Sequence, residues 1–123
     1  MTTRYTRDHE WVRLEGDLAV MGISKYAQEQ LGDIVYVELP ALGKKLERGG
    51  DAAVVESVKA ASEVFAPIAG EVVAVNDALT DQPGKVNEDA EGAGWFAKLK
   101  PVDKADIDQL MDAEAYVAFL ETI

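Results

Sequence analysis

The sequence predicts a mostly β domain, a sandwich or partly open barrel, with a short helix in its N-terminal half and helices at its C-terminus. Short runs rich in β-branched and aromatic residues recur along the chain, which is typical of strands. Gly, Pro, Asn and Asp separate these runs and favour turns. Helical spacing of apolar residues marks the segment 103–121. With 123 residues, 48% of them hydrophobic, we expect one domain, residues 1–123, with its core in roughly residues 17–100.

Two strands and a helix are expected at the start of the chain. Residues 9–14 and 18–23 lie on either side of a Gly-containing turn, as in a pair of antiparallel strands. Ser24 stands where a helix N-cap is expected, and residues 25–31 carry a small apolar face. Gly32 follows as a residue suited to end that helix in a left-handed conformation.

The rest of the core is expected to consist of strands and loops. Further strands are predicted at residues 32–39, at two segments within 52–65, at 71–75 and at 95–99. Residues 43–51 and 76–94 are charged, polar or Gly-rich and are expected to be irregular. Asp103 is placed to cap the first C-terminal helix.

A faint internal repeat links two of the predicted strands. Residues 32–38 and 70–76 both place a Gly, then an acid, then a β-branched run in the same order. Two equivalent half-sheets related by approximate symmetry would produce this repeat. Chance likeness between Val-rich strands is the alternative.

Composition excludes several classes of function. The formal net charge is −11, and this field repels phosphate backbones, so the sequence argues against nucleic-acid binding and favours partners with basic surfaces. There is no cysteine, which excludes disulfides, cysteine metal sites and cysteine nucleophiles. The single histidine, His9, lacks the second histidine of a zinc-protease helix, and no serine has a histidine base nearby in sequence. An enzyme in its own right is therefore the weakest hypothesis.

The start of the chain shows no targeting pattern. Residues 1–11 are polar and charged, unlike a signal peptide or an Arg/Ser-rich presequence. No apolar run approaches the ~20 residues of a membrane span. We expect a cytoplasmic protein without a membrane partner. The mitochondrial matrix would apply only to a chain from which a presequence has been removed.

Residues 54–65 are nearly palindromic about the bond between Lys59 and Ala60. An antiparallel hairpin with Lys59 and Ala60 as a two-residue loop would produce this pattern, with Glu56 opposite Glu63. Two features conflict with ordinary hairpin stability: Lys-Ala lacks the Gly or Asn that tight hairpin turns prefer, and like charges oppose each other. Local rules broken at one place often mark function. We interpret Lys59 as a lysine presented beyond the strands for covalent loading, although the pattern alone leaves open an ordinary exposed loop lysine.

Residues 55–62, Val-Glu-Ser-Val-Lys-Ala-Ala-Ser, closely resemble the lipoylation motif of the glycine cleavage system H protein family. Further segments resemble that family in the same order: residues 9–12, 22–28, 31–40, 67–72, 75–76, 86–87 and 94–95. The resemblance therefore covers nearly the whole chain. It implies a lipoyl/biotinyl-carrier-type β-sandwich, the hybrid barrel-sandwich, with lipoate joined to the Lys59 amine as an amide.

The resemblance also implies a function and partners. The family's members shuttle the aminomethyl intermediate of glycine decarboxylation from a pyridoxal-phosphate glycine decarboxylase (P-protein) to a tetrahydrofolate-dependent aminomethyltransferase (T-protein). A dihydrolipoamide dehydrogenase (L-protein) then reoxidises the dithiol. A lipoate ligase or lipoyl/octanoyl transferase attaches the cofactor. The chemistry then belongs to cofactors and partner enzymes, with Lys59 as attachment point.

By the same resemblance, Glu10, Gln30 and Glu63 are expected to lie near the docked arm, where carboxylates could hold its cationic amine. Some members of the family have His where this chain has Gln30. Two other assignments stay open: a lipoyl relay that supplies other lipoylated complexes, and a biotin carrier. Biotin carriers usually flank their lysine with methionines, whereas Val58 and Ala60 flank Lys59 here.

Overall fold

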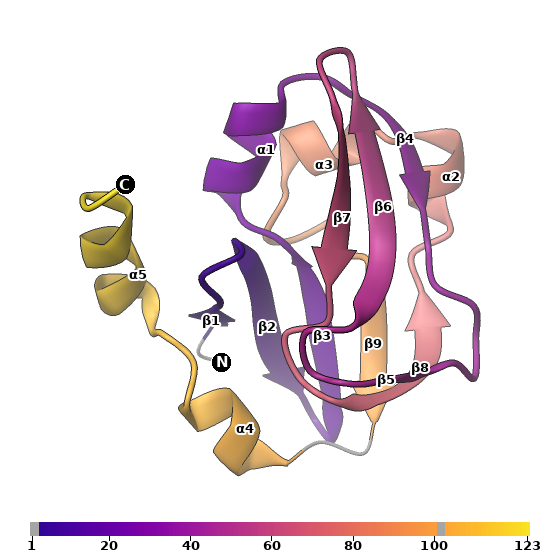
Figure 1. Cartoon of the computed structure of the whole chain (residues 1–123). Coiled ribbons are helices and arrows are strands. Elements are labelled where there is room, and N and C mark those ends of the chain that lie inside the picture. Colours follow the sequence, from indigo (N-terminus) through magenta and orange to yellow (C-terminus); the bar gives the residue numbers. More distant parts are fainter. Residues whose placement is uncertain (1–2, 101–102) are drawn as a thin grey trace.

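A computed structural model describes residues 3–100 and 103–123 of the chain (Figure 1). Its strands form two antiparallel sheets, one in the order β1-β2-β3-β9-β8-β5 and one in the order β4-β6-β7. The strands are β1 (Thr3–Tyr5), β2 (Glu10–Glu15), β3 (Leu18–Ile23), β4 (Ile34–Glu38), β5 (Lys45–Leu46), β6 (Asp51–Ser57), β7 (Ala61–Phe65), β8 (Gly70–Val75) and β9 (Ala97–Lys100). The helices are α1 (Lys25–Leu31), α2 (Ala78–Asp81), α3 (Lys85–Glu88), α4 (Lys104–Asp108) and α5 (Ala113–Leu120). The mostly β fold predicted from the sequence is confirmed.

The first half of the chain folds as its local sequence predicts. β2 and β3 pair in register around Gly16, whose positive φ of 62° suits the turn. Ser24 caps α1, its Oγ accepting a hydrogen bond from the Ala27 amide at 3.1 Å. Gly32 ends α1 with φ of 80°, in a region that side-chain-bearing residues rarely adopt.

Two segments predicted to be irregular contain short elements. β5 lies within residues 43–51 and pairs with β8. α2 and α3 lie within residues 76–94, and each buries one apolar residue, Leu79 and Val86. Elements of two to four residues are too short to show a hydrophobic period, so the prediction of irregular structure was wrong here.

The internal repeat has a structural counterpart. β4 shifts register between Ile34 and Tyr36, and β8 shifts register between Val72 and Ala74, at the corresponding positions of the repeat. Each shift is a bulge that adds one residue to the strand. The likeness between the two segments therefore extends from sequence to backbone geometry.

One main core lies between the two sheets. Its fully buried side chains include Val12, Met21, Val55, Ile68, Val72, Leu79, Val86, Phe96 and Leu99. No helix in the part of the chain that the structure describes is long and apolar enough to cross a lipid bilayer.

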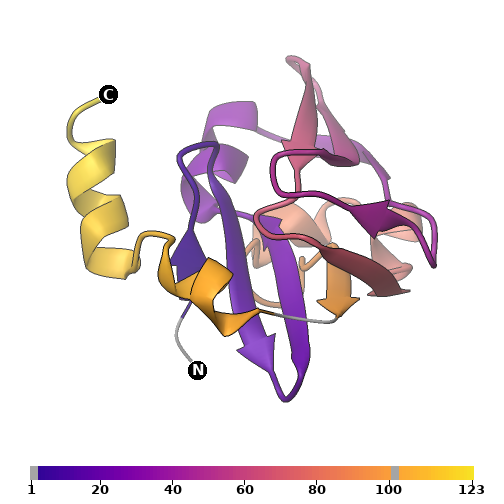
Figure 2. The ribbon, with the colours of Figure 1, turned by 60° about the horizontal axis from the view of Figure 1, so that its bottom comes forward.

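The C-terminal helices lie on one flank of the larger sheet, as expected (Figure 2). Asp103 caps α4 by accepting a hydrogen bond from the Ala105 amide at 2.9 Å. α5 is attached through Tyr116, whose ring stacks on Tyr5 with 4.3 Å between centroids. The Tyr116 hydroxyl also lies 2.7 Å from Ser24 Oγ, so a contact buried in the protein fixes α5 beside the start of α1.

Candidate functional site

Lys59 lies at the tip of the β6–β7 hairpin, which projects from the upper end of the molecule in Figure 1. Its side chain is exposed. The hairpin register differs from the predicted one, because Glu56 pairs with Ala61 and Glu63 pairs with Val54. The predicted apposition of Glu56 and Glu63 was therefore wrong. The centre of the turn is formed by Val58 and Lys59, and not by Lys59 and Ala60.

Ser57 explains how this turn forms without Gly or Asn. The Ser57 amide donates to the Ala60 carbonyl at 2.8 Å, which closes the loop. Ser57 Oγ accepts hydrogen bonds from the amides of Lys59 and Ala60, both at 3.1 Å. A hydroxyl that satisfies two turn amides stabilises a loop in which neither Val58 nor Lys59 needs a positive φ.

The base of the turn is tied to the segment between α1 and β4. The Val58 amide donates to the Asp33 carbonyl at 3.1 Å. Asn87, on α3, accepts a hydrogen bond from the Ile34 amide and donates one to the Gly32 carbonyl, both at 2.8 Å. Hydrogen bonds to the segment between α1 and β4 therefore fix the backbone of the turn, and this positions the lysine amine without enclosing it.

The stem of Lys59 lies across Gly32. A Cβ atom at residue 32 would be 3.3 Å from Lys59 Cε, closer than most Cβ contacts in proteins. The absence of a side chain at Gly32 thus leaves space for the methylene chain of the lysine. The sequence indicated Gly32 only as a helix terminator, and it gave no indication that Asn87 holds this segment.

The three residues expected near a docked arm do not share one cavity. Gln30 is exposed on α1. Glu63 is exposed on β7 and borders a cavity of about 360 Å³ together with Glu38 and Lys44. Glu10 borders a different cavity, described next.

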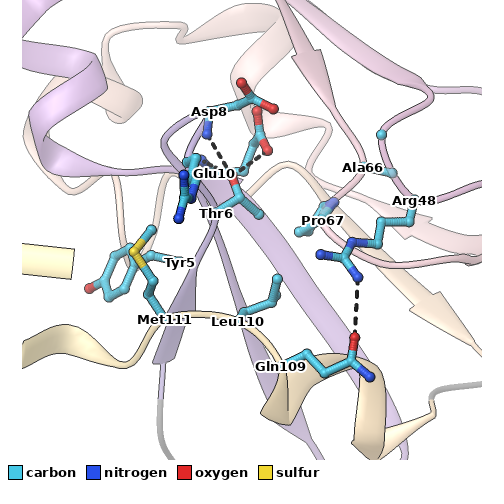
Figure 3. Close-up of a pocket in the computed structure, with 12 residues that line it drawn as sticks. Tyr5, Thr6, Asp8, Glu10, Arg48, Ala66, Pro67, Gln109, Leu110 and Met111 are labelled. Carbon is cyan, nitrogen blue, oxygen red and sulfur yellow. Dashed lines mark hydrogen bonds between the residues drawn. The ribbon is translucent and has the colours of Figure 1, made fainter. Parts of the chain in front are cut away.

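Glu10 is almost fully buried, with 3% of its surface exposed. It lines a cavity of about 240 Å³ between residues 5–8 and the segments 48–49, 66–67 and 109–111 (Figure 3). The C-terminal segment thus forms one wall of the cavity that holds this carboxyl group.

Burial raises the pKa of Glu10 to about 7. Repulsion from Asp8 acts in the same direction. Two hydrogen bonds act against it: Thr6 Oγ1 donates to Glu10 Oε1 at 2.7 Å, and the Phe65 backbone contributes a second. Near neutral pH, Glu10 is therefore present in both its protonated and its charged form.

This raised pKa makes the stability of the fold depend on pH. Between the ordinary value of 4.5 and about 7, the folded chain keeps the Glu10 proton that the unfolded chain has lost. Ionisation of Glu10 therefore leaves the free energy of unfolding unchanged below that window and lowers it increasingly as pH rises through the window. Glu10→Gln removes the titration, so the free energy of unfolding of the variant relative to wild type should rise by up to about 3 kcal/mol across the window.

Urea unfolding of both chains at about pH 5 and about pH 8 measures this difference. Both chains share all other carboxylates, so the contributions of these groups cancel in the difference between the two free energies of unfolding. A difference between the chains that is the same at both pH values would contradict the raised pKa.

Nearly the whole chain matches a known protein family. Residues 3–123 match the family described as "Glycine cleavage H-protein". The chain belongs to the glycine cleavage H-protein family. This confirms the resemblance seen in the motif around Lys59.

Relatives of known name cover almost the full length of the chain. The glycine cleavage system H protein of Beijerinckia indica is 61% identical over 98% of this chain and 98% of its own. That of Xanthobacter autotrophicus is 62% identical over 99% of this chain and 98% of its own. The crystal structure of a glycine cleavage system H protein from Mycobacterium marinum superposes with a TM-score of 0.88 at 35% identity, covering 98% of this chain and 97% of that one. Family members are carrier subunits, so a carrier role in glycine cleavage follows, and the relay and biotin alternatives are not favoured.

Proposed function

We propose that the chain carries lipoate on Lys59 and serves as the mobile carrier of the glycine cleavage system. The observation that carries this proposal is the placement of Lys59, exposed at the centre of a turn that Ser57 closes. The Asp33 carbonyl ties this turn to the segment 32–34, which Asn87 holds in turn. The family assignment supports the same role.

The residues around Lys59 fit a long acyl chain on the amine. The side chain is exposed, and the space above Gly32 accepts its stem. Amide formation would remove the lysine charge while leaving the turn unchanged, since the turn is closed by backbone groups and Ser57. When bound, lipoate supplies a disulfide that can be reduced and can take up a one-carbon amine group.

The attachment step requires an activated acyl donor. The Lys59 nitrogen, after losing its ammonium proton, attacks the acyl carbon of a lipoyl adenylate. The new C–N bond replaces the C–O bond to phosphate, AMP leaves, and a second proton passes from nitrogen to solvent as the amide forms. No electrons are exchanged, so this step needs no oxidant or reductant.

The partners of this proposal are the glycine decarboxylase, the aminomethyltransferase, the dihydrolipoamide dehydrogenase and a lipoate ligase or lipoyl/octanoyl transferase. A net charge of −11 suits transient docking on basic surfaces, which raises association rates. The tether then raises the effective concentration of the arm at each partner. The bacterial relatives are consistent with a cytoplasmic location.

Glu10, Gln30 and Glu63 remain in the proposal as residues that hold the arm on the surface. The cavity beside Glu10 supports its part in this role, because the carboxyl group lines a space that could take up the amine end of the arm. Amide and side-chain NMR shifts of the unmodified and the lipoylated chain test it. Shifts confined to the hairpin tip would contradict the assignment.

The deciding experiment is acylation of the intact chain by a lipoate ligase with ATP and lipoate, followed by intact-mass analysis and peptide mapping. We expect one lipoyl group per chain, on the peptide that contains Lys59. An unchanged mass, or a lipoyl group on another lysine, would overturn the proposal. Biotin on Lys59 after incubation with a biotin ligase, without lipoylation, would instead identify a biotin carrier.

A further inference from the structure

Three apolar side chains are exposed close to Lys59. Val58 is 68% exposed at the turn, and Val35 and Tyr36 at the start of β4 are 54% and 47% exposed. In the described residues seven large apolar side chains are exposed, and three of them lie here. Exposed apolar residues that are gathered at one place, unlike single ones, indicate an interaction site.

A bulge in β4 causes this exposure. Ile34 pairs with Ser57 and Tyr36 pairs with Glu56, so Val35 is an extra residue in the strand. In a regular strand one of two successive side chains would face the core, whereas Val35 and Tyr36 are both exposed. The backbone of β4 is thus shaped so that two neighbouring apolar groups face solvent.

The internal repeat provides a comparison within the same molecule. Val73 occupies the equivalent bulge in β8 and is 39% exposed, but it is followed by Ala74 where β4 has Tyr36. The bulge therefore occurs in both copies of the repeat, whereas the large aromatic side chain occurs only in the copy beside Lys59. An aromatic ring that offers apolar area and a hydroxyl is a common centre of protein interfaces.

The exposed apolar residues are connected to Lys59 through short contacts. The Val58 amide is bonded to the Asp33 carbonyl, and the stem of Lys59 lies over Gly32. The segment from Gly32 to Tyr36 thus runs directly beside the turn. An enzyme that reaches the lysine nitrogen must cover this segment.

Acidic side chains surround the apolar group. Three acidic side chains are exposed here: Asp33 directly before β4, Glu38 at its end, and Glu56 on β6, opposite Tyr36. A partner that covers this surface needs an apolar centre with basic residues around it, because buried like charges would weaken the contact.

We infer that Val35, Tyr36 and Val58 form the docking surface for the enzyme that acylates Lys59, a partner with an apolar contact area and a basic rim. This inference rests on the proposed lipoylation of Lys59. The acylating enzyme must bring its own active site to the lysine nitrogen, so it cannot avoid the adjacent surface. Among the proposed partners, the acylating enzyme is the one whose reaction takes place at the lysine nitrogen itself, so the position of this surface favours it as the occupant.

The test compares acylation rates of variants by an adenylate-forming lipoate ligase, with ATP and lipoate in excess and the chain as the varied substrate. Val35→Thr/Tyr36→Ala removes these apolar side chains. Ala is chosen at residue 36 because Ala74 occupies the equivalent position in the other copy of the repeat. We expect KM for the chain to rise about 30-fold with kcat unchanged, the size typical of an interface centre. Val35→Thr alone keeps the branched shape and should raise KM about 5-fold.

Val73→Thr is the matched control, since it makes the same change at the equivalent bulge away from Lys59. Its KM should stay within about twofold of wild type. Urea unfolding of each variant verifies that the folded fraction is the same. The inferred docking surface is wrong if Val35→Thr/Tyr36→Ala keeps the wild-type KM, or if Val73→Thr raises KM by as much as that double variant does. Lipoylation of Lys59 would still stand in either case. If wild type itself accepts no lipoyl group, the proposed function fails first.

Discussion

Lys59→Arg is expected to abolish lipoylation of the chain while leaving the fold intact. Arginine keeps the positive charge and the length of the side chain, but its guanidinium stays protonated at any pH a protein tolerates and offers no free amine. The Lys59 side chain is exposed, so the substitution removes no buried contact. Intact-mass analysis after incubation with a lipoate ligase should show less than about 1% of the wild-type acylation rate, the loss expected when the only nucleophile is removed.

Lys45→Arg serves as the control for this prediction. Lys45 is exposed in β5, which lies away from the tip of the β6–β7 hairpin in Figure 1. The Lys45→Arg variant should be acylated on Lys59 at the wild-type rate. Acylation of Lys59→Arg at a comparable rate would show that another lysine is the attachment point, and peptide mapping would identify it.

The position of Lys59 on a hairpin could be predicted from sequence, but the register of that hairpin could not. The Val-rich strands on either side pair plausibly in more than one register, so the palindrome did not decide between them. The hydrogen bonds of Ser57 and the anchoring of Val58 to Asp33 decide it. The second of these joins residues that are distant in sequence, which strand patterns do not report.

Elements governed by local chemistry were predicted closely. α1 begins at Lys25 after its Ser24 cap and ends at Gly32, because capping depends on neighbouring residues alone. β5, α2 and α3 escaped prediction because their few residues are ordered by burial against the core and not by intrinsic preference.

The environment of Glu10 could not be predicted from sequence for the same reason. Its cavity is built by segments at both ends and in the middle of the chain, and its raised pKa follows from that enclosure. Glu10 was selected as a candidate site residue from the family resemblance alone. Its raised pKa comes first from burial in the folded chain and then from repulsion by Asp8, while the hydrogen bonds of Thr6 and Phe65 act against it.

Gly22→Ala should destabilise the fold by about 3 kcal/mol, the upper range for overpacking a core. Gly22 pairs directly with Trp11 across β2 and β3. A Cβ atom at residue 22 would lie 2.8 Å from Trp11 Nε1 and 3.0 Å from Cε2. Trp11 is fully buried, and its indole N–H donates to the Ala90 carbonyl at 2.9 Å, so the ring cannot move aside without losing that bond.

Urea unfolding measures this effect, and Gly84→Ala is the matched control. Gly84 has φ of −62° and nothing within 4 Å of an added Cβ, so Ala should be neutral there or stabilise by about 0.5 kcal/mol. Equal midpoints for wild type and Gly22→Ala would contradict the close contact between the Gly22 backbone and Trp11.

The same variant separates stability from function. Trp11 holds Ala90, and the neighbouring Glu91 carboxylate accepts the Lys25 amide at the start of α1 at 2.9 Å. These contacts lie at the opposite end of α1 from Gly32, where the stem of Lys59 rests. At low temperature, where Gly22→Ala remains folded, its acylation rate per folded chain should equal that of wild type. A lower rate per folded chain would mean that the position of α1 also controls the presentation of the lysine.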